Sequence, residues 1–151
     1  MPRQTSKRNK LKEIPPGKIS PFNRLIGLRR IRAGGGRAEI TLELRAGHRN
    51  RRGVAHGGLL SALLDAALGS AVVSGIGAEE WCGTAQLSVQ FRHPGTGPVL
   101  KGHGRMARRG KRLAFAEGEV VDAGGKVVAA AHGTWYIWPA RPDTPPDGSA
   151  S

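Results

Sequence analysis

One carboxylate lies in the middle of the most apolar segment of this 151-residue chain. Asp65 falls within residues 57–74, which are otherwise dominated by alanine, leucine and glycine. A buried carboxylate is costly without a partner, so its presence indicates a partner or a purpose. Asp65 is therefore either a general base or a group that only hydrogen-bonds a neighbouring chain. In a helix, Asp65 would lie on one stripe together with Gly58, Ser61, Gly69 and Val72. The small residues of this stripe would leave room for a ligand or a second helix.

Glycines open the same segment. His56-Gly57-Gly58 stands where the helix would begin, and the first N–H groups of a helix lack backbone partners and carry partial positive charge. Glycine lets a ligand approach that backbone closely. The N–H of Gly57, and that of Gly58, could therefore hold a carbonyl oxygen that becomes negative during acyl transfer. The alternative interpretation is a glycine-rich loop with a capping histidine or asparagine.

An ordered motif joins these residues. It reads Asn50-x-x-Gly-x-x-His56-Gly57-Gly58, with Asp65 seven residues after the last glycine. This motif resembles the signature of hotdog-fold acyl-CoA thioesterases, in the phenylacetic-acid-degradation (PaaI-like) branch of the 4-hydroxybenzoyl-CoA thioesterase superfamily. The resemblance covers residues 22–137, and downstream it includes Thr84, the run Phe91-Arg92-His93-Pro94 and the run Gly110-Lys111-Arg112-Leu113-Ala114-Phe115.

The resemblance implies thioester hydrolysis without a metal or another cofactor, in a homodimer or a homotetramer built as a dimer of dimers. Asp65 would be the general base, with direct attack by its carboxylate as the less favoured variant. Asn50 would position the water or the thioester, and Thr84 would hydrogen-bond the water or Asp65. His56 would hold Asn50 or its loop, or would only cap the helix.

The spacing supports a dimer independently of the resemblance. Gly57 and Asp65 are eight residues apart, which is about 12 Å along a helix. A general base and an oxyanion donor must both lie within roughly 3 Å of the reacting groups. Two antiparallel helices from two subunits would bring Asp65 of one subunit close to Gly57 of the other. A two-fold axis would then create two equal sites.

Coenzyme A carries phosphates, so basic residues near the site are candidate substrate contacts. Gly58 and Ser61 would face the substrate from the helix. The alternative for most of the basic residues is a solvated basic face. The basic candidates are Arg92, Arg109, Lys111 and Arg112, with Arg51, Arg52 and Arg108 as further ones.

The segments around the helix read as strands. Residues 37–44 and 84–91 alternate apolar and polar side chains, and residues 28–33 do so more weakly. Short turns join three further strands, which must therefore be antiparallel; we expect them near residues 99–108, 112–122 and 126–138. The sequence predicts an α+β fold in which an antiparallel sheet of five or six strands wraps around one central helix, buried on most sides. This is the hotdog fold that the resemblance implies.

Positive charge is concentrated at the N-terminal end. The chain has 24 Lys and Arg against 11 Asp and Glu, and 15 of the basic residues lie in residues 1–52. We expect residues 1–19 to be a disordered basic tail, residues 20–138 one folded domain, and residues 139–151 a second disordered tail. The basic tail is either solubilising, which is the favoured interpretation, or an arm that binds nucleic acid.

The single cysteine, Cys82, excludes an internal disulfide and suits a reducing compartment, so we expect a cytoplasmic protein. The histidines lack the spacing of zinc ligands. No apolar stretch of signal-peptide length opens the chain, and residues 59–73 read as too short and too polar to span a bilayer, so no membrane partner is expected.

Two other functions stay open on the same fold. One is a non-catalytic acyl-CoA-binding regulator whose basic arm contacts nucleic acid. Against it, the arm has no helix-turn-helix pattern, and Asn50 and Asp65 are both present. The other is a hotdog dehydratase, which usually needs a histidine paired with an acid at a spacing that this chain does not show.

Overall fold

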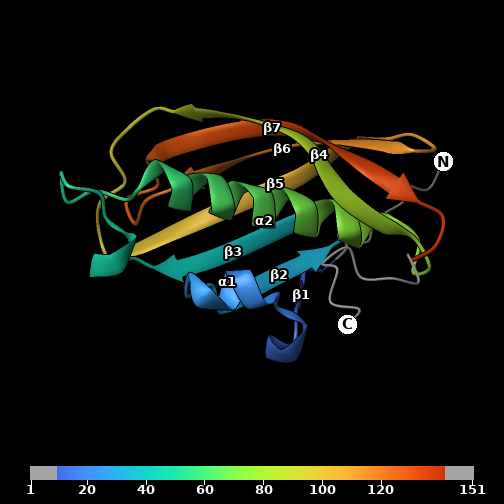
Figure 1. Ribbon diagram of the computed structural model, residues 1–151, viewed down its shortest axis with the longest axis horizontal. Helices are drawn as coiled ribbons and strands as arrows, with labels where there is room; N and C mark the ends of the chain where they lie inside the picture. Colours follow the sequence, from blue (N-terminus) through green and yellow to red (C-terminus); the bar gives the residue numbers. More distant parts are fainter. Residues whose placement is uncertain (1–9, 142–151) are drawn as a thin grey trace, which may run out of the picture.

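The computed structural model describes residues 10–141 (Figure 1). The long helix α2 (Gly57–Gly75) lies against a seven-stranded sheet, and a short helix, α1 (Pro21–Leu25), precedes the second strand. Single-turn 3-10 helices occur at η1 (Pro16–Lys18) and η2 (Ala46–His48). The strands are β1 (Lys12–Glu13), β2 (Arg30–Gly34), β3 (Arg37–Glu43), β4 (Trp81–Phe91), β5 (Val99–Arg109), β6 (Leu113–Val121) and β7 (Val127–Trp138).

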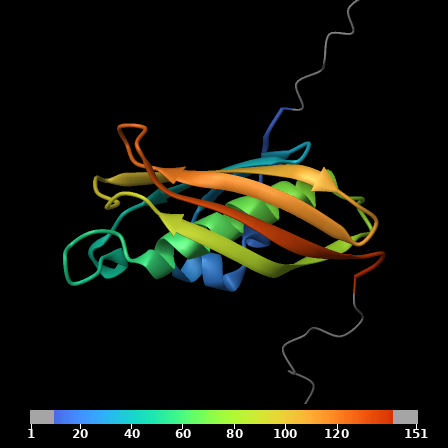
Figure 2. The same cartoon turned by 90° about the horizontal axis from the view of Figure 1, so that it is seen from above.

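Neighbouring strands are antiparallel throughout the sheet, in the order β1-β2-β3-β5-β6-β7-β4. β5, β6 and β7 form the meander that their short connections predict. The sheet curves around α2, which lies along its concave face (Figures 1 and 2). The predicted α+β hotdog fold is confirmed, with seven strands instead of five or six because β1 adds to one edge.

Residues 10–19, which we expect within the basic tail, pack on the domain. Lys12 pairs with Ala33 in the β1–β2 ladder, and the N–H of Ile14 donates to the carbonyl of Ile31 at 2.8 Å. Ile19 is only 4% exposed and belongs to the core. The folded part therefore begins before residue 20. The sequence hides this because isolated isoleucines among prolines and basic residues show no periodicity.

The C-terminal boundary also differs slightly from the prediction. The guanidinium of Arg141 lies 4.9 Å from the centre of the Trp81 ring, so the first residues of the predicted C-terminal tail contact the domain. The remainder of both predicted tails, residues 1–9 and 142–151, lies outside the described residues.

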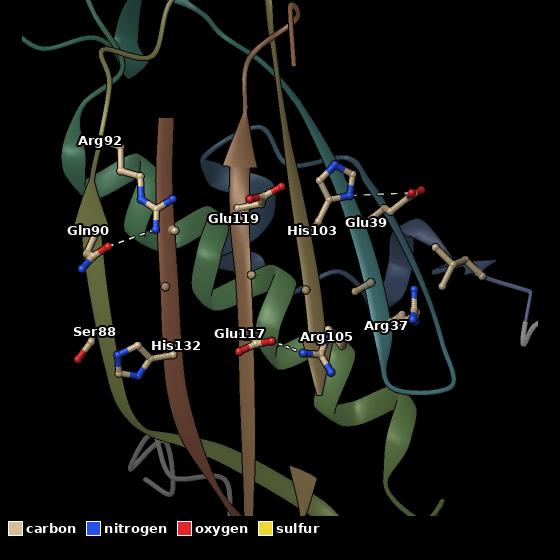
Figure 3. Close-up of a pocket in the computed structure, with 16 residues that line it drawn as sticks. Arg37, Glu39, Ser88, Gln90, Arg92, His103, Arg105, Glu117, Glu119 and His132 are labelled. Atoms are coloured by element: carbon tan, nitrogen blue, oxygen red, sulfur yellow. Dashed lines mark hydrogen bonds and ion pairs between the residues drawn. The ribbon is translucent and has the colours of Figure 1, made fainter. Parts of the chain in front are cut away.

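The convex face of the sheet carries charged and polar side chains from strand to strand, and they line a shallow hollow (Figure 3). Arg105 of β5 pairs with Glu117 of β6, and Glu39 of β3 pairs with Arg32 of β2 at 3.3 Å. The alternation that predicts the strands thus separates this polar face from the face that α2 covers.

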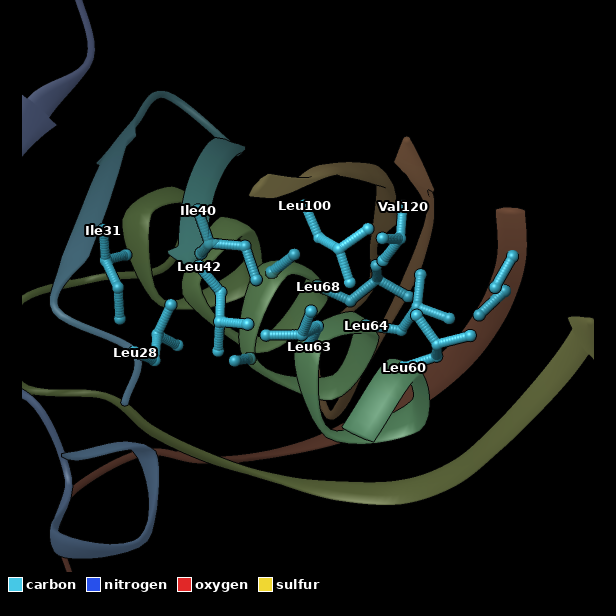
Figure 4. Packing of buried hydrophobic residues seen from close by; sticks show 14 of the residues in the cluster. Leu28, Ile31, Ile40, Leu42, Leu60, Leu63, Leu64, Leu68, Leu100 and Val120 are labelled. Carbon is cyan, nitrogen blue, oxygen red and sulfur yellow. The ribbon is translucent and has the colours of Figure 1, made fainter. Parts of the chain in front are cut away.

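The concave face and α2 form the hydrophobic core (Figure 4). Leu63, Leu64 and Leu68 are fully buried. The helix lies so close to β5 that a Cβ on Gly104 would be 2.4 Å from the carbonyl oxygen of Ala67. By length and composition alone α2 could cross a membrane, contrary to our expectation. Its apolar character is accounted for by this packing.

One side of α2 stays uncovered in the protomer. Asp65 and Gly69 are half-buried, and Val73 is 60% exposed. The helix is buried on most sides, as expected, and it is open only on the side that the curved sheet does not cover. Val72, which we placed on the small-residue stripe, is fully buried in the core, and Val73 continues the open side instead.

β4 forms one edge of the sheet. It pairs with β7 on one side, and no strand within the described residues pairs with its other side. Alternate residues along the eleven-residue strand β4 therefore present unpaired backbone donors and acceptors beside the open side of α2.

Candidate active site

The start of α2 leaves one backbone N–H free. His56 caps the helix: its Nδ1 accepts a hydrogen bond from the N–H of Gly58 at 2.9 Å, and its carbonyl accepts from the N–H groups of Leu59 and Leu60. The N–H of Gly57 has no partner among the described residues. The donor predicted at Gly57 is available, whereas Gly58 is engaged by the cap. Of the two roles considered for His56, the structure shows the cap.

An aromatic ring borders this free N–H. A Cβ on Gly57 would lie 3.4 Å from a ring carbon of Phe91, the last residue of β4. Phe91 is 57% exposed in the protomer, so the donor lies beside an open apolar surface. Sequence reasoning placed Phe91 in the motif but gave it no role. Its only signal was a bulky aromatic residue at a strand end.

Asp65 lies on the open side of α2 and is hydrogen-bonded to β4. The hydroxyl of Thr84 donates to Asp65 Oδ1 at 2.8 Å, so the predicted contact between these two residues is present. The carboxylate is half-buried, and it has no ion-pair partner within residues 10–141. Because it keeps contact with solvent, it avoids most of the cost that full burial would impose.

A β-bulge directs Thr84 toward the helix. Strict alternation would put Thr84 and Leu87 on opposite faces of β4, yet Thr84 bonds to α2 and Leu87 packs against the core beneath the same helix. The register of β4 against β7 shifts between Thr84 and Gln86. An extra residue in one strand re-aims the side chains that follow it, and this irregularity is not visible in the apolar pattern.

Asn50 shapes the loop that precedes α2. Its Oδ1 accepts a hydrogen bond from the N–H of Arg52 at 2.9 Å, and its own N–H donates to the carbonyl of Val54 at 2.8 Å. Gly53 has φ of +79°, a left-handed conformation that glycine adopts without strain. No hydrogen bond joins Asn50 to His56 in the described chain, so the contact predicted between them is absent. Both residues nevertheless line one hollow.

The other predicted substrate contacts do not gather around Asp65 within one protomer. The hydroxyl of Ser61 donates to the carbonyl of Gly57 at 2.9 Å, inside α2. Arg92 lies on the convex face, where its guanidinium donates to Gln90 at 3.3 Å (Figure 3). The sequence shows a basic residue close to the motif, but not the face of the sheet from which it projects.

The turn between β5 and β6 carries the remaining basic candidates. Arg109 forms an ion pair with Glu80, just beyond the C-terminal end of α2. A hydrogen bond from the N–H of Gly77, together with the Arg109 guanidinium, lowers the pKa of Glu80. Lys111 and Arg112 are exposed in the same turn. These residues thus lie near the end of α2, away from its start.

Cys82 is half-buried on β4, and burial raises the pKa of its thiol. A raised pKa disfavours the reactive thiolate, and the Cys82 side chain packs against the hydrophobic core. Within residues 10–141, no three His, Cys, Asp or Glu side chains come together as a metal site would require.

The family profile of the thioesterase superfamily matches residues 52–129, from the loop before α2 into β7. A candidate esterase of Saccharolobus solfataricus is 31% identical over 102 residues, which span 68% of this chain and 72% of that protein. The matched residues of the family profile include α2 and the strands β4, β5 and β6.

Solved structures share the fold. A conserved protein of Pseudomonas aeruginosa has a TM-score of 0.76 at 32% identity, over 80% of this chain and 95% of that one. A mutant of the phenylacetic acid degradation protein PaaI of Thermus thermophilus has a TM-score of 0.69 at 29% identity, over 78% and 98%. A Bacillus halodurans protein whose crystal contains CoA has a TM-score of 0.64 at 26% identity, over 66% and 70%. This chain therefore belongs to the thioesterase superfamily, as a PaaI-like thioester hydrolase with the hotdog fold.

Proposed function

We propose that this hydrolase acts on acyl-CoA thioesters at a site that two subunits share. One observation carries the proposal: α2 bears a free N–H at Gly57 and, two turns further on, a carboxylate at Asp65 that Thr84 holds on the open side of the helix. The CoA in the related Bacillus halodurans crystal supports acyl-CoA as the substrate class.

A second subunit would bring the two groups together. β4 has an unpaired edge, and the open side of α2 beside it carries the small residues Ser61 and Gly69 around Asp65. Pairing of two β4 edges across a two-fold axis would lay the two α2 helices side by side and antiparallel. Asp65 of the partner subunit would then lie close to Gly57.

The proposed reaction is attack of water on the thioester carbonyl. The N–H of Gly57 donates to the carbonyl oxygen and stabilises its negative charge in the tetrahedral intermediate. Asp65 of the partner subunit takes a proton from the water as the C–O bond forms. The C–S bond then breaks, the CoA thiolate takes up that proton, and the acid and CoA leave. The side-chain N–H groups of Asn50 position the water or the thioester.

The test is an assay of the hydrolysis of aryl and short- to medium-chain acyl-CoA thioesters, in which the released CoA thiol is measured. The wild type should turn over at least one of them. Asp65→Asn should lower kcat about 10²- to 10⁴-fold, the usual effect of losing a general base, with little change in KM. A wild type that binds acyl-CoA without turning any of it over would overturn the proposal and favour the non-catalytic regulator.

A further inference from the structure

A hollow of 530 Å³ lies at the start of α2, and Asn50 is the one lining residue that the proposed reaction uses directly. Its lining is unusual in composition, because three of the five residues are arginines and none is acidic; the lining residues are Arg49, Asn50, Arg51, Arg52 and His56. Such a surface repels cations and attracts anions.

Each side-chain polar group left open in the hollow is a hydrogen-bond donor. The Oδ1 of Asn50 is occupied by the N–H of Arg52, which leaves its NH2 group for the proposed reaction. The Nδ1 of His56 is occupied by the N–H of Gly58, which places the ring proton on Nε2. One guanidinium nitrogen of Arg49 donates to the carbonyl of Gly53 at 2.7 Å, and within residues 10–141 no hydrogen bond or ion pair engages the guanidinium groups of Arg51 and Arg52. The side chains of this lining therefore offer donors to a ligand that carries acceptors.

The backbone of the loop that carries these donors is fixed by its own hydrogen bonds. The N–H of Gly53 donates to the carbonyl of Asn50 at 2.9 Å, so Arg51 and Arg52 occupy the two central positions of a β-turn. A bridge between Arg49 and Ala55 closes the loop below the turn. Arg51 and Arg52 therefore lie at the tip of the loop that precedes α2, and Figure 1 shows this loop extending past the start of the helix. A preorganised site loses less entropy when it binds.

We propose that this hollow binds phosphate groups of the CoA nucleotide, an inference that rests on the proposed function. The planar guanidinium group matches phosphate oxygens in two-point hydrogen bonds. The thioester end of the same molecule must reach Gly57, and the tip of the loop lies several residues away from it along the chain. That separation leaves space for the uncharged pantetheine arm between the thioester and the phosphates.

The experiment compares two substrates with the same acyl group, one on CoA and one on N-acetylcysteamine, which has no phosphate. The measured quantity is the ratio of kcat/KM for the CoA substrate to kcat/KM for the N-acetylcysteamine substrate. In the full chain, Arg51→Ala/Arg52→Ala should lower this ratio about 10- to 100-fold, because the loss of each charged hydrogen bond should weaken binding of the CoA substrate about 3- to 10-fold. The matched control is Arg29→Ala/Arg30→Ala, which removes two exposed adjacent arginines elsewhere and should keep the ratio. An unchanged ratio in the loop variant, or an equal fall in the control, would overturn the inference.

Calorimetry with free CoA separates this inference from the proposed function. The wild type should bind CoA, and the loop variant should bind it at least tenfold more weakly even if no thioester is turned over. Dephospho-CoA, which lacks the 3′-phosphate but keeps the diphosphate, distinguishes the two phosphate sources. If wild type and loop variant bind dephospho-CoA equally well, the hollow binds the 3′-phosphate. If the loop variant still binds it more weakly, the hollow binds the diphosphate. Equal affinity of wild type and loop variant for both ligands would contradict a phosphate site.

Discussion

In the proposed mechanism, His56 determines which backbone N–H at the start of α2 is free to bind the thioester carbonyl. By accepting from the N–H of Gly58 it removes that group from the site, and it leaves the N–H of Gly57 next to the ring of Phe91. The motif alone makes both glycines candidates. The distinction depends on the rotamer of one histidine, which no spacing in the sequence encodes.

Substitution of Gly57 tests this assignment at the residue scale. A methyl group there would contact the Phe91 ring at 3.4 Å and occupy space beside the N–H, so Gly57→Ala should hinder the approach of the thioester carbonyl and lower kcat/KM by up to about a hundredfold, the effect of a small misplacement of reacting groups. The melting temperature should change little. Gly47→Ala is the control, because a Cβ there meets nothing within 4 Å. Equal activity of the two variants would disprove the role of Gly57.

Thr84 holds Asp65 through one hydrogen bond of 2.8 Å. Thr84→Val keeps the shape of the side chain but removes the donor, so kcat should fall about tenfold while stability changes by about 1 kcal/mol or less. Thr41→Val on β3 provides the matched control, since the Thr41 hydroxyl forms no hydrogen bond within residues 10–141 and lies on the face of β3 opposite to the buried Ile40 and Leu42. Steady-state kinetics of both variants make the comparison. Equal kcat values for the two variants would show that Thr84 is only a strand former.

At the scale of elements, the apolar pattern predicts most of the fold. The alternation in β3 and the all-round apolar run of α2 are strong local signals, because each element must present apolar side chains to the core. The edge position of β4 is not a local property, since it depends on long-range pairing with β7. The bulge after Thr84 and the short strand β1 escape prediction for the same reason: neither leaves a periodic trace.

Truncation tests the unexpected N-terminal strand. Removal of residues 1–16 takes away β1 and Ile14, with their backbone bonds to β2. We therefore expect the free energy of unfolding of this truncated chain to be about 1–3 kcal/mol lower than that of the chain that lacks only residues 1–9. The difference arises because the shorter chain loses the partly buried side chain of Ile14 and several hydrogen bonds. Denaturant unfolding of the two truncated chains makes the comparison. Identical midpoints and slopes would place the fold boundary after residue 16, as the sequence suggested.

At the scale of the whole molecule, the proposed function requires two chains, because a single chain separates the two groups that the reaction needs. The free N–H of Gly57 lies at the start of α2, and the carboxylate of Asp65 lies in the middle of the same helix. The open side of α2 and the free edge of β4 lie next to each other, so one two-fold contact would cover both and complete two sites. The sequence already suggested this from the spacing of Gly57 and Asp65, although it overestimated how far a single chain buries Asp65.

Mixing of two inactive variants tests the shared site most directly. Asp65→Asn and Asn50→Ala should each be nearly inactive alone. In a mixed dimer, one site collects both substitutions and the other collects neither, so random subunit exchange should restore about a quarter of wild-type activity. Native mass spectrometry confirms that exchange has occurred. Mixed dimers that remain inactive after confirmed exchange would contradict the shared site and place Asn50 and Asp65 in the same chain's site.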